Sequence, residues 1–162
     1  GPVNMLGLQV FLLYRVRAGV AMQSTVQWLN GVAFNATASS GHQVVMDGSP
    51  EYGGENRGSR PMELLLMGLG GCASFDVVTI LKKARQDVTD VRCELKAERF
   101  DGIPAVFTKI HLHFVVTGKS VKEKQVEKAI HLSSETYCSA SRMLSAGGVE
   151  ITHSFEVIEA AE

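Results

Sequence analysis

The feature that most constrains the fold is a long apolar segment in the middle of the chain. Leu64–Phe75 contains no charged residue, and Ser59–Glu63 before it supplies a capping residue, a proline and an early acid, all favourable at a helix start. We predict a helix from this point to about Gln86. Because it is apolar nearly all round until Asp76, it should lie at the centre of the fold, wrapped by sheet. The apolar run is too short to span a bilayer, so we expect no membrane segment.

Short alternating patterns precede this helix. Asn30-Gly31, a strong hairpin signal, separates two such patterns, Thr25–Leu29 and Val32–Ala36. His42–Met46 predicts a third strand, and the glycine-containing stretch Asp47–Arg60 predicts a long loop. We therefore expect the chain to open with a three-stranded region.

Longer alternating patterns follow the helix. Val91–Glu98 and Ala105–Val116 predict an antiparallel pair of strands, and Val149–Ile158 predicts a final strand. Between them, a capping box at Ser120–Glu123 opens a helix that breaks near Ser133-Ser134, and a shorter helix follows the break. Three strands, a helix, two strands, two helices and a strand make an α+β fold rather than a wound parallel sheet.

Composition and charge limit the classes of function. With 162 residues, 45% of them hydrophobic and 20% charged, the chain suits one globular domain, which we place at 22–162. The net charge is −1 and no run of five or more like charges occurs, so neither nucleic acid nor a membrane is an expected partner. Three cysteines is an odd, low number, which favours reduced thiols and a cytoplasmic location over a secreted disulfide scaffold.

Residues 1–21 are interpreted separately from the core. Gly1-Pro2 is typical of what a cleaved affinity tag leaves, so we interpret 1–21 as a tag remnant and upstream extension. A signal peptide is the alternative, because Leu6–Tyr14 is apolar. Its arginines follow this apolar run instead of preceding it, which is the wrong order for a signal peptide.

Two cysteines lie in settings that could support chemistry. Cys72 follows Gly70-Gly71, whose small size leaves space beside the sulfur. Ser133-Ser134-Glu135 is typical of an N-cap and first turn, so Cys138 is expected near a helix N-terminus, where the dipole and free amides favour a thiolate. Arg142 one turn later could add positive charge. Taken alone, two cysteines on core helices are more often packing residues than a redox pair.

The other candidate side chains point to structure. Cys93 alternates with apolar residues and is expected on the inward face of its strand. His111 and His113 share an outward face that lacks an evident third metal ligand, so a solvated strand face is the preferred interpretation. His131 could pair with Cys138 as a base, but the predicted helix break lies between them.

Two stretches carry a resemblance to a known family. The stretch Ser59–Cys72 resembles the first-cysteine helix of the OsmC/Ohr family. Tyr137–Leu144, followed by Val149–Ile151, resembles its second-cysteine motif. The likeness covers essentially all of 22–158 and is strongest to the YhfA-like branch.

The resemblance implies a fold and an activity. The family fold is an intertwined homodimer in which antiparallel sheets wrap long central helices. The implied activity is reduction of a small organic hydroperoxide, with Cys72 forming a sulfenic acid and Cys138 resolving it as a disulfide. A small dithiol or a dithiol protein would return the electrons, and neither a metal nor another cofactor would be needed.

The chain departs from the family pattern around the first cysteine. The family uses an arginine from its N-terminal strands, whereas this chain has none between Met22 and Asn56. Arg60 and Arg142 are the candidate substitutes by location, together with Arg57. The family glutamate directly follows the helix-start proline, where this chain has Met62 and then Glu63.

Glu63 and Asp76 both bear on the reactivity of Cys72. At about 100° per residue, Glu63 falls on the helix face opposite Cys72, so it serves either catalysis or the helix dipole. Asp76, one turn after Cys72, would disfavour a thiolate if it had no partner. A non-enzymatic ligand-binding or redox-sensing dimer on the same scaffold, or a purely structural role for the cysteines, therefore stays open beside the peroxidase.

Overall fold

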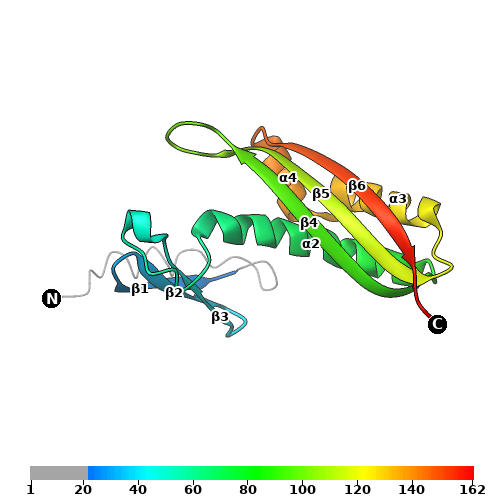
Figure 1. Ribbon diagram of the computed structural model, residues 1–162, viewed down its shortest axis with the longest axis horizontal. Helices are drawn as coiled ribbons and strands as arrows, with labels where there is room; N and C mark the ends of the chain where they lie inside the picture. Colours follow the sequence, from blue (N-terminus) through cyan, green and yellow to red (C-terminus); the bar gives the residue numbers. More distant parts are fainter. Residues whose placement is uncertain (1–21) are drawn as a thin grey trace. The chain divides into compact units, whose positions relative to one another are not determined.

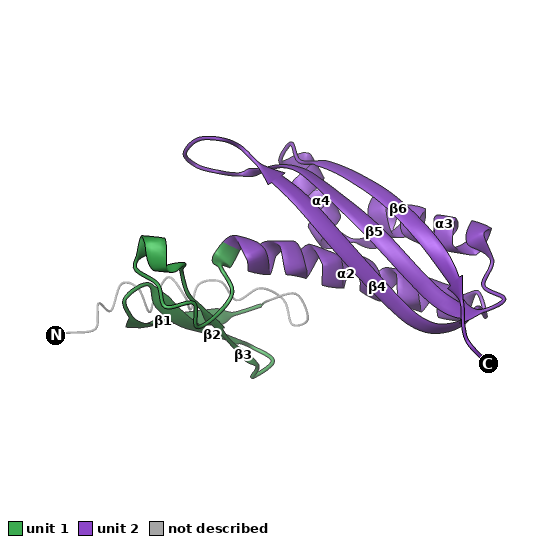
Figure 2. Cartoon of the chain, viewed as in Figure 1, with its two compact units in different colours: residues 1–61 green, residues 62–162 purple. Residues whose placement is uncertain are grey.

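The computed structural model describes residues 22–162, so the predictions for residues 1–21 lie outside the described residues. The chain divides into two compact units, with the boundary between Pro61 and Met62 (Figure 2). Each unit is described by itself below. The prediction of one domain over 22–162 stays a prediction.

The first unit contains the three predicted strands. Strands β1 (Ser24–Asn30), β2 (Ala33–Ala38) and β3 (Gln43–Met46) form an antiparallel sheet in that order (Figure 1). The hairpin at Asn30-Gly31 is confirmed, and Gly31 takes the left-handed conformation with φ of 53° that such a turn favours. The sheet keeps large apolar side chains in contact with solvent, among them Trp28, which is 60% exposed.

A buried carboxylate organises the loop after β3, which contains a short 3-10 helix, η1 (Pro50–Tyr52). Asp47 is 1% exposed and accepts hydrogen bonds from the backbone amides of Gly48, Glu55 and Arg57 and from the Arg57 guanidinium. Burial acts to raise the pKa of Asp47, but these hydrogen bonds outweigh it and hold the pKa well below its usual range. The hydrogen bonds of the predicted loop therefore converge on the buried carboxylate of Asp47.

The second unit contains a mixed three-stranded sheet. Strands β4 (Asp87–Arg99) and β5 (Phe107–Lys119) pair antiparallel, as predicted, and β6 (Glu150–Glu159) joins the other side of β5. This last pairing is parallel, with Lys109 opposite Glu150 at its start. The α+β class is thus confirmed, with one parallel pair in a sheet expected to be antiparallel. A parallel pair needs a long crossover connection, and the helices between β5 and β6 provide it.

The helices of the second unit lie on one face of its sheet (Figure 1). They are α2 (Pro61–Lys83), α3 (Glu123–Leu132) and α4 (Ser139–Ala146). The predicted break after α3 is a π-helical turn, η2 (Ser133–Tyr137). The order of helices and strands matches the prediction.

The predicted capping box at Ser120–Glu123 is wrong. The N-cap of α3 is Lys122, and no side chain caps the helix there. Ser120 instead takes a φ of 53°, and its backbone amide donates to both carboxylate oxygens of Glu159 at 3.0 and 3.2 Å. The local sequence matches the capping-box motif, but the hydrogen bonds to Glu159 at the end of β6 hold the backbone of Ser120 in the left-handed conformation instead.

Helix α2 has one buried and one open side. Its buried residues face the sheet and the other helices of the unit, whereas Leu65 and Phe75 are 55% and 71% exposed. The sequence predicts that α2 is buried on all sides, but in this chain one side of the helix is exposed. The buried residues are Leu69, Gly70, Ala73, Val77 and Leu81.

The length of α2 also changes one expectation. The apolar run Leu64–Phe75 is too short to cross a bilayer, but the helix extends beyond it on both sides. By length and composition alone α2 could cross a membrane, with a mean hydropathy of 1.9 over its most apolar window. The core helix of a globular protein meets the same two criteria, and α2 contributes directly to the core of the second unit.

Candidate active site

Cys72 and Cys138 meet in the core of the second unit. Cys72 lies on α2 and is partly buried, whereas Cys138 lies between η2 and α4 and is 2% exposed. The two side chains are close enough for Cys72 to raise the pKa of Cys138, and both are free thiols. The fold therefore brings together the two cysteines that the sequence motifs single out.

The local backbone turns Cys138 into the cap of α4. Cys138 has the extended conformation of an N-cap, and its Sγ accepts a hydrogen bond from the Ser141 amide at 3.4 Å. The sequence predicts Ser133-Ser134-Glu135 as the cap and first turn, but these residues form the π-turn instead. The cysteine itself, rather than a preceding serine, begins the helix.

This environment keeps Cys138 protonated. Burial raises the pKa of the Cys138 thiol, the side chain and backbone amide of Ser141 act to lower it, and Cys72 raises it further. The expected thiolate at a helix N-terminus is therefore not favoured at Cys138, because burial and the second sulfur outweigh the helix end. A protonated Cys138 can donate its S–H to the sulfur of Cys72.

The two glycines before Cys72 have different roles. A side chain at Gly70 would approach Leu95 on β4 to 2.7 Å, so Gly70 allows α2 to lie close against the sheet. Gly71 is exposed, with no atom within 4 Å of the position a side chain would take. The space predicted beside Cys72 thus exists at Gly71, whereas Gly70 serves packing.

Ser133 connects α2 to the segment that carries Cys138. Its hydroxyl, on a residue only 2% exposed, donates to Asp76 Oδ2 at 2.9 Å and lies 3.5 Å from the Ala73 carbonyl oxygen. Asp76 therefore has a hydrogen-bond partner, although a neutral hydroxyl leaves the negative charge of the carboxylate in place. Sequence reasoning did not select Ser133 as a site residue, because only the fold places it against α2.

Arg142 lies one turn after Cys138 on α4. Both residues line a cavity of about 430 Å³, together with Glu135 of the π-turn. The predicted proximity of Arg142 to Cys138 is thus present in the fold. Whether Arg142 acts on the thiols stays a prediction.

The other two predicted site residues lie at the start of α2. Glu63 is an exposed residue in its first turn. Arg60 belongs to the first unit, where its Nη1 donates to Asn56 Oδ1 at 2.7 Å and to the Gly58 carbonyl at 3.1 Å. The catalytic roles of Glu63 and Arg60 stay predictions.

Cys93 is separate from the thiol pair. It packs on the inward side of β4 as predicted, half-buried and hydrogen-bonded to Ser74. Burial raises the pKa of the Cys93 thiol, the hydrogen bond to Ser74 lowers it, and the charge of Glu94 raises it. Cys93 is therefore a packing thiol with low nucleophilicity at neutral pH.

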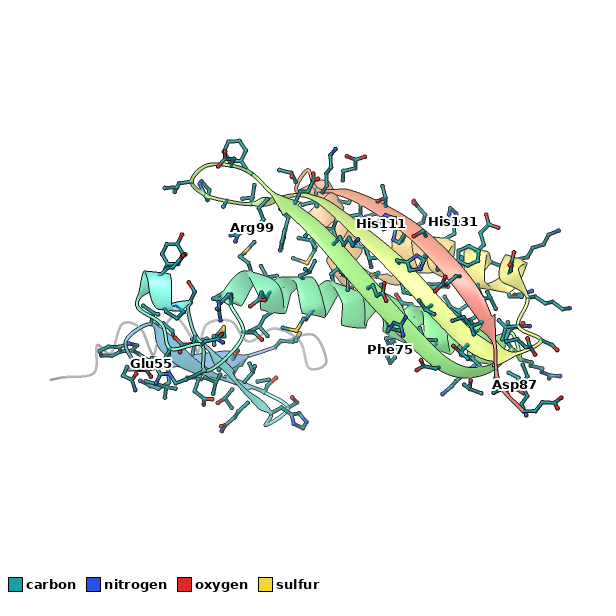
Figure 3. The ribbon with its side chains drawn as sticks, viewed as in Figure 1. Glu55, Phe75, Asp87, Arg99, His111 and His131 are labelled. Carbon is teal, nitrogen blue, oxygen red and sulfur yellow. The ribbon has the colours of Figure 1, made fainter. Side chains whose placement is uncertain are left out.

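The histidines of the second unit form two groups, one on the outer face of the sheet and one between β6 and α3. On one face, His111 bonds through Nδ1 to Thr152 Oγ1 at 2.6 Å and through Nε2 to Ser154 Oγ at 2.7 Å (Figure 3). His113 shares the same Ser154 hydroxyl at 2.7 Å. Among residues 22–162, no cluster of three or more His, Cys, Asp or Glu residues could hold a metal ion.

The second histidine group faces the helices. His131 and His153 line a cavity of about 520 Å³ that also reaches Glu135. Burial lowers the pKa of His153, the charge of His111 lowers it further, and Glu135 raises it. Glu135 thus borders both this cavity and the one beside Cys138.

Solved structures share this arrangement of strands and helices. A protein from Aquifex aeolicus, described as hypothetical, is 32% identical, with a TM-score of 0.76 over 87% of this chain and 98% of its own. An organic hydroperoxide resistance protein OsmC from Legionella pneumophila is 17% identical, with a TM-score of 0.66 over 86% of this chain and 99% of its own. At that identity the Legionella protein supports the fold alone.

Sequence comparisons agree with the fold. Protein YhfA of Escherichia coli K12 is 46% identical over 139 residues, which is 86% of this chain and 100% of YhfA. The family model for OsmC-like proteins matches residues 54–154, a range that includes both Cys72 and Cys138. The chain therefore belongs to the family of OsmC-like proteins.

Proposed function

We propose that this protein reduces organic hydroperoxides with Cys72 as the attacking thiol and Cys138 as the resolving thiol. The observation that carries the proposal is that the two free thiols are neighbours, close enough for Cys72 to raise the pKa of Cys138. The family contains proteins described as organic hydroperoxide resistance proteins, which supports the same chemistry.

The electrostatics of the pair support this division of roles. Because burial and the neighbouring sulfur raise the pKa of Cys138, Cys138 is the thiol that keeps its proton. Its S–H can therefore act as a donor toward the neighbouring Cys72 sulfur. Cys72 is also the more exposed of the two sulfur-bearing residues, which suits the thiol that must meet the peroxide.

The reaction has two steps on the protein. The Cys72 thiolate attacks the terminal oxygen of the hydroperoxide, the O–O bond breaks, and the alcohol leaves with a proton while Cys72 becomes a sulfenic acid. Cys138 then attacks the Cys72 sulfur, so the S–S bond forms, the S–O bond breaks and water leaves. A dithiol reduces the disulfide and becomes oxidised itself, and neither step needs a metal or another cofactor.

The charged candidates have subsidiary roles in this proposal. Arg142, which lines the cavity beside Cys138, offers positive charge to an approaching thiolate of the reductant. Catalytic roles for Glu63 and Arg60 at the start of α2 stay predictions. The reduced thiols suit the cytoplasm, where we place the protein.

We also propose that the protein works as a homodimer. Helix α2 exposes a groove of about 490 Å³, and Phe75, which lines it, is 71% exposed. A helix with a wide apolar surface is stable in water when a second apolar surface covers it. A second copy of α2 would provide such a surface.

The test is a titration of the reduced protein with one equivalent of cumene hydroperoxide. We expect loss of one equivalent of peroxide and of two thiols, with a Cys72–Cys138 disulfide identified by peptide mass. Cys72→Ser should abolish peroxide consumption, and Cys93→Ser, the matched control, should leave it unchanged. Peroxide consumption by Cys72→Ser at the wild-type rate would refute the proposal.

A second measurement separates an enzyme from a redox sensor or ligand-binding protein. With excess cumene hydroperoxide and a small dithiol such as dihydrolipoamide, we expect many turnovers per protein molecule. A single turnover followed by a stable disulfide would favour a sensor. An unchanged thiol count would favour a binding role.

A further inference from the structure

The contact between Ser133 and Asp76 ties the two cysteine-bearing segments together. Asp76 lies one turn after Cys72 on α2, and its Oδ2 accepts the Ser133 hydroxyl at 2.9 Å. Ser133 also reaches the Ala73 carbonyl of the same helix at 3.5 Å. One side chain therefore fixes the start of the π-turn to the part of α2 that holds Cys72.

The same residue also fixes Cys138 through its backbone. The Cys138 amide donates to the Ser133 carbonyl at 2.8 Å, the bond that closes the π-turn. Ser133 is thus bonded to α2 by its hydroxyl and to Cys138 by its carbonyl. Since Ser133 is 2% exposed, water has little access with which to replace the hydroxyl contact.

We propose that Ser133 is a positioning residue that holds Cys138 against Cys72 and so sets the rate at which the disulfide closes. This inference rests on the proposed two-step reaction and concerns its second step. After Cys72 becomes a sulfenic acid, closure requires the Cys138 sulfur to stay in line with the S–O bond that breaks. Small displacements of reacting atoms lower such rates strongly.

The π-turn explains why Cys138 would depend on Ser133 for its position. A π-turn is a rare, poorly packed form of helix that occurs mostly where function requires it. Without the Ser133 hydroxyl, the chain from 133 to 137 can relax toward a regular helix or a looser loop. Either change would move Cys138, which directly follows the turn and caps α4.

The experiment follows each step separately. Reduced protein receives one equivalent of cumene hydroperoxide, and dimedone traps the Cys72 sulfenic acid at timed intervals before peptide mass analysis. We expect Ser133→Ala to oxidise Cys72 at the wild-type rate but to close the disulfide about tenfold more slowly, because one hydrogen bond to a charged acceptor is lost. Ser133→Thr, which keeps a hydroxyl, should restore closure to within about twofold.

The neighbouring serine provides a matched control. The Ser134 hydroxyl bonds to the His131 carbonyl at 3.3 Å, within its own segment. Ser134→Ala should therefore close the disulfide at the wild-type rate. Asp76→Ala should slow closure as Ser133→Ala does, and the double variant should be no slower than either single variant, because both remove one contact.

The outcomes decide between positioning and other roles. Wild-type closure in Ser133→Ala, or equal slowing in Ser134→Ala, would overturn the proposal. A thiol oxidant, diamide, forms the disulfide without peroxide and provides an independent arm. If peroxide fails to oxidise wild-type Cys72 but diamide closes the disulfide more slowly in Ser133→Ala, the peroxidase proposal falls and the positioning role stands.

Discussion

At the scale of single residues, Cys138 combines a structural role with a chemical one. Its sulfur accepts the Ser141 amide and begins α4, and the same sulfur faces Cys72. A reaction that converts Cys138 to a disulfide therefore also changes the cap of a helix. Two substitutions that both remove the thiol, Cys138→Ala and Cys138→Ser, should therefore differ in their effect on stability.

We expect Cys138→Ala to be less stable than Cys138→Ser by about 1 kcal/mol, because a serine hydroxyl can accept the Ser141 amide and a methyl group cannot. Neither variant can form the disulfide with Cys72, so both should accumulate Cys72 sulfenic acid after peroxide treatment. Urea unfolding of the reduced variants measures the difference in stability. Equal stabilities would show that the sulfur does not act as a cap.

His153 provides a dependence of stability on pH. Its pKa in the folded protein is lowered from 6.5, first by burial and then by His111, so the unfolded chain binds the proton more readily. The stability linked to His153 is therefore present above pH 6.5 and is lost as the pH falls below that value. We expect a lower urea midpoint at pH 5 than at pH 7.5, and a smaller difference in His153→Gln. An equal difference in that variant would assign the effect to other groups.

At the scale of elements, local sequence patterns predict the strands and helices well. The Asn30-Gly31 hairpin and the alternating residues of β4 and β5 are found as predicted, because the side-chain period and the turn residues decide these elements locally. The incorrect predictions concern the ends of the helices and strands and the turns that join them. Ser120 fails as a cap because distant Glu159 binds its amide, and no local pattern contains that contact.

The candidate site could likewise be predicted only in part from the sequence. Family motifs select Cys72 and Cys138 from the sequence, but they do not show the cap on α4, the raised pKa of Cys138 or the contact between Ser133 and Asp76. Each of these depends on residues far apart in the sequence that packing brings together. Ser133 is one of two adjacent serines, and only its position against α2 distinguishes it from Ser134.

At the scale of the whole molecule, the open side of α2 is the feature that calls for a partner. Phe75 is an exposed aromatic residue on the helix that carries Cys72 (Figure 3). A large apolar patch is seldom exposed to solvent on the surface of a soluble monomeric protein. The proposed homodimer would cover them with the same surface of a second copy.

We expect Phe75→Asp to weaken the homodimer strongly, because a carboxylate would replace an aromatic ring in an apolar interface. Light scattering after size exclusion measures the mass, with wild type as a dimer and the variant as a monomer at micromolar concentration. Ile103→Asp is the matched control, since Ile103 is fully exposed in the loop between β4 and β5. A monomeric wild-type protein would refute the proposed dimer.

The parallel pairing of β5 with β6 has a consequence for biosynthesis. The crossover that contains α3, η2 and α4 connects β5 to β6, so we expect this segment to be fixed against the sheet only after β6 has joined β5. On the ribosome, α2 and its cysteine are synthesised long before that strand emerges. We therefore expect the two thiols to meet only after β6 has been synthesised, so that until then the growing chain holds Cys72 without the neighbour that would capture its oxidised form.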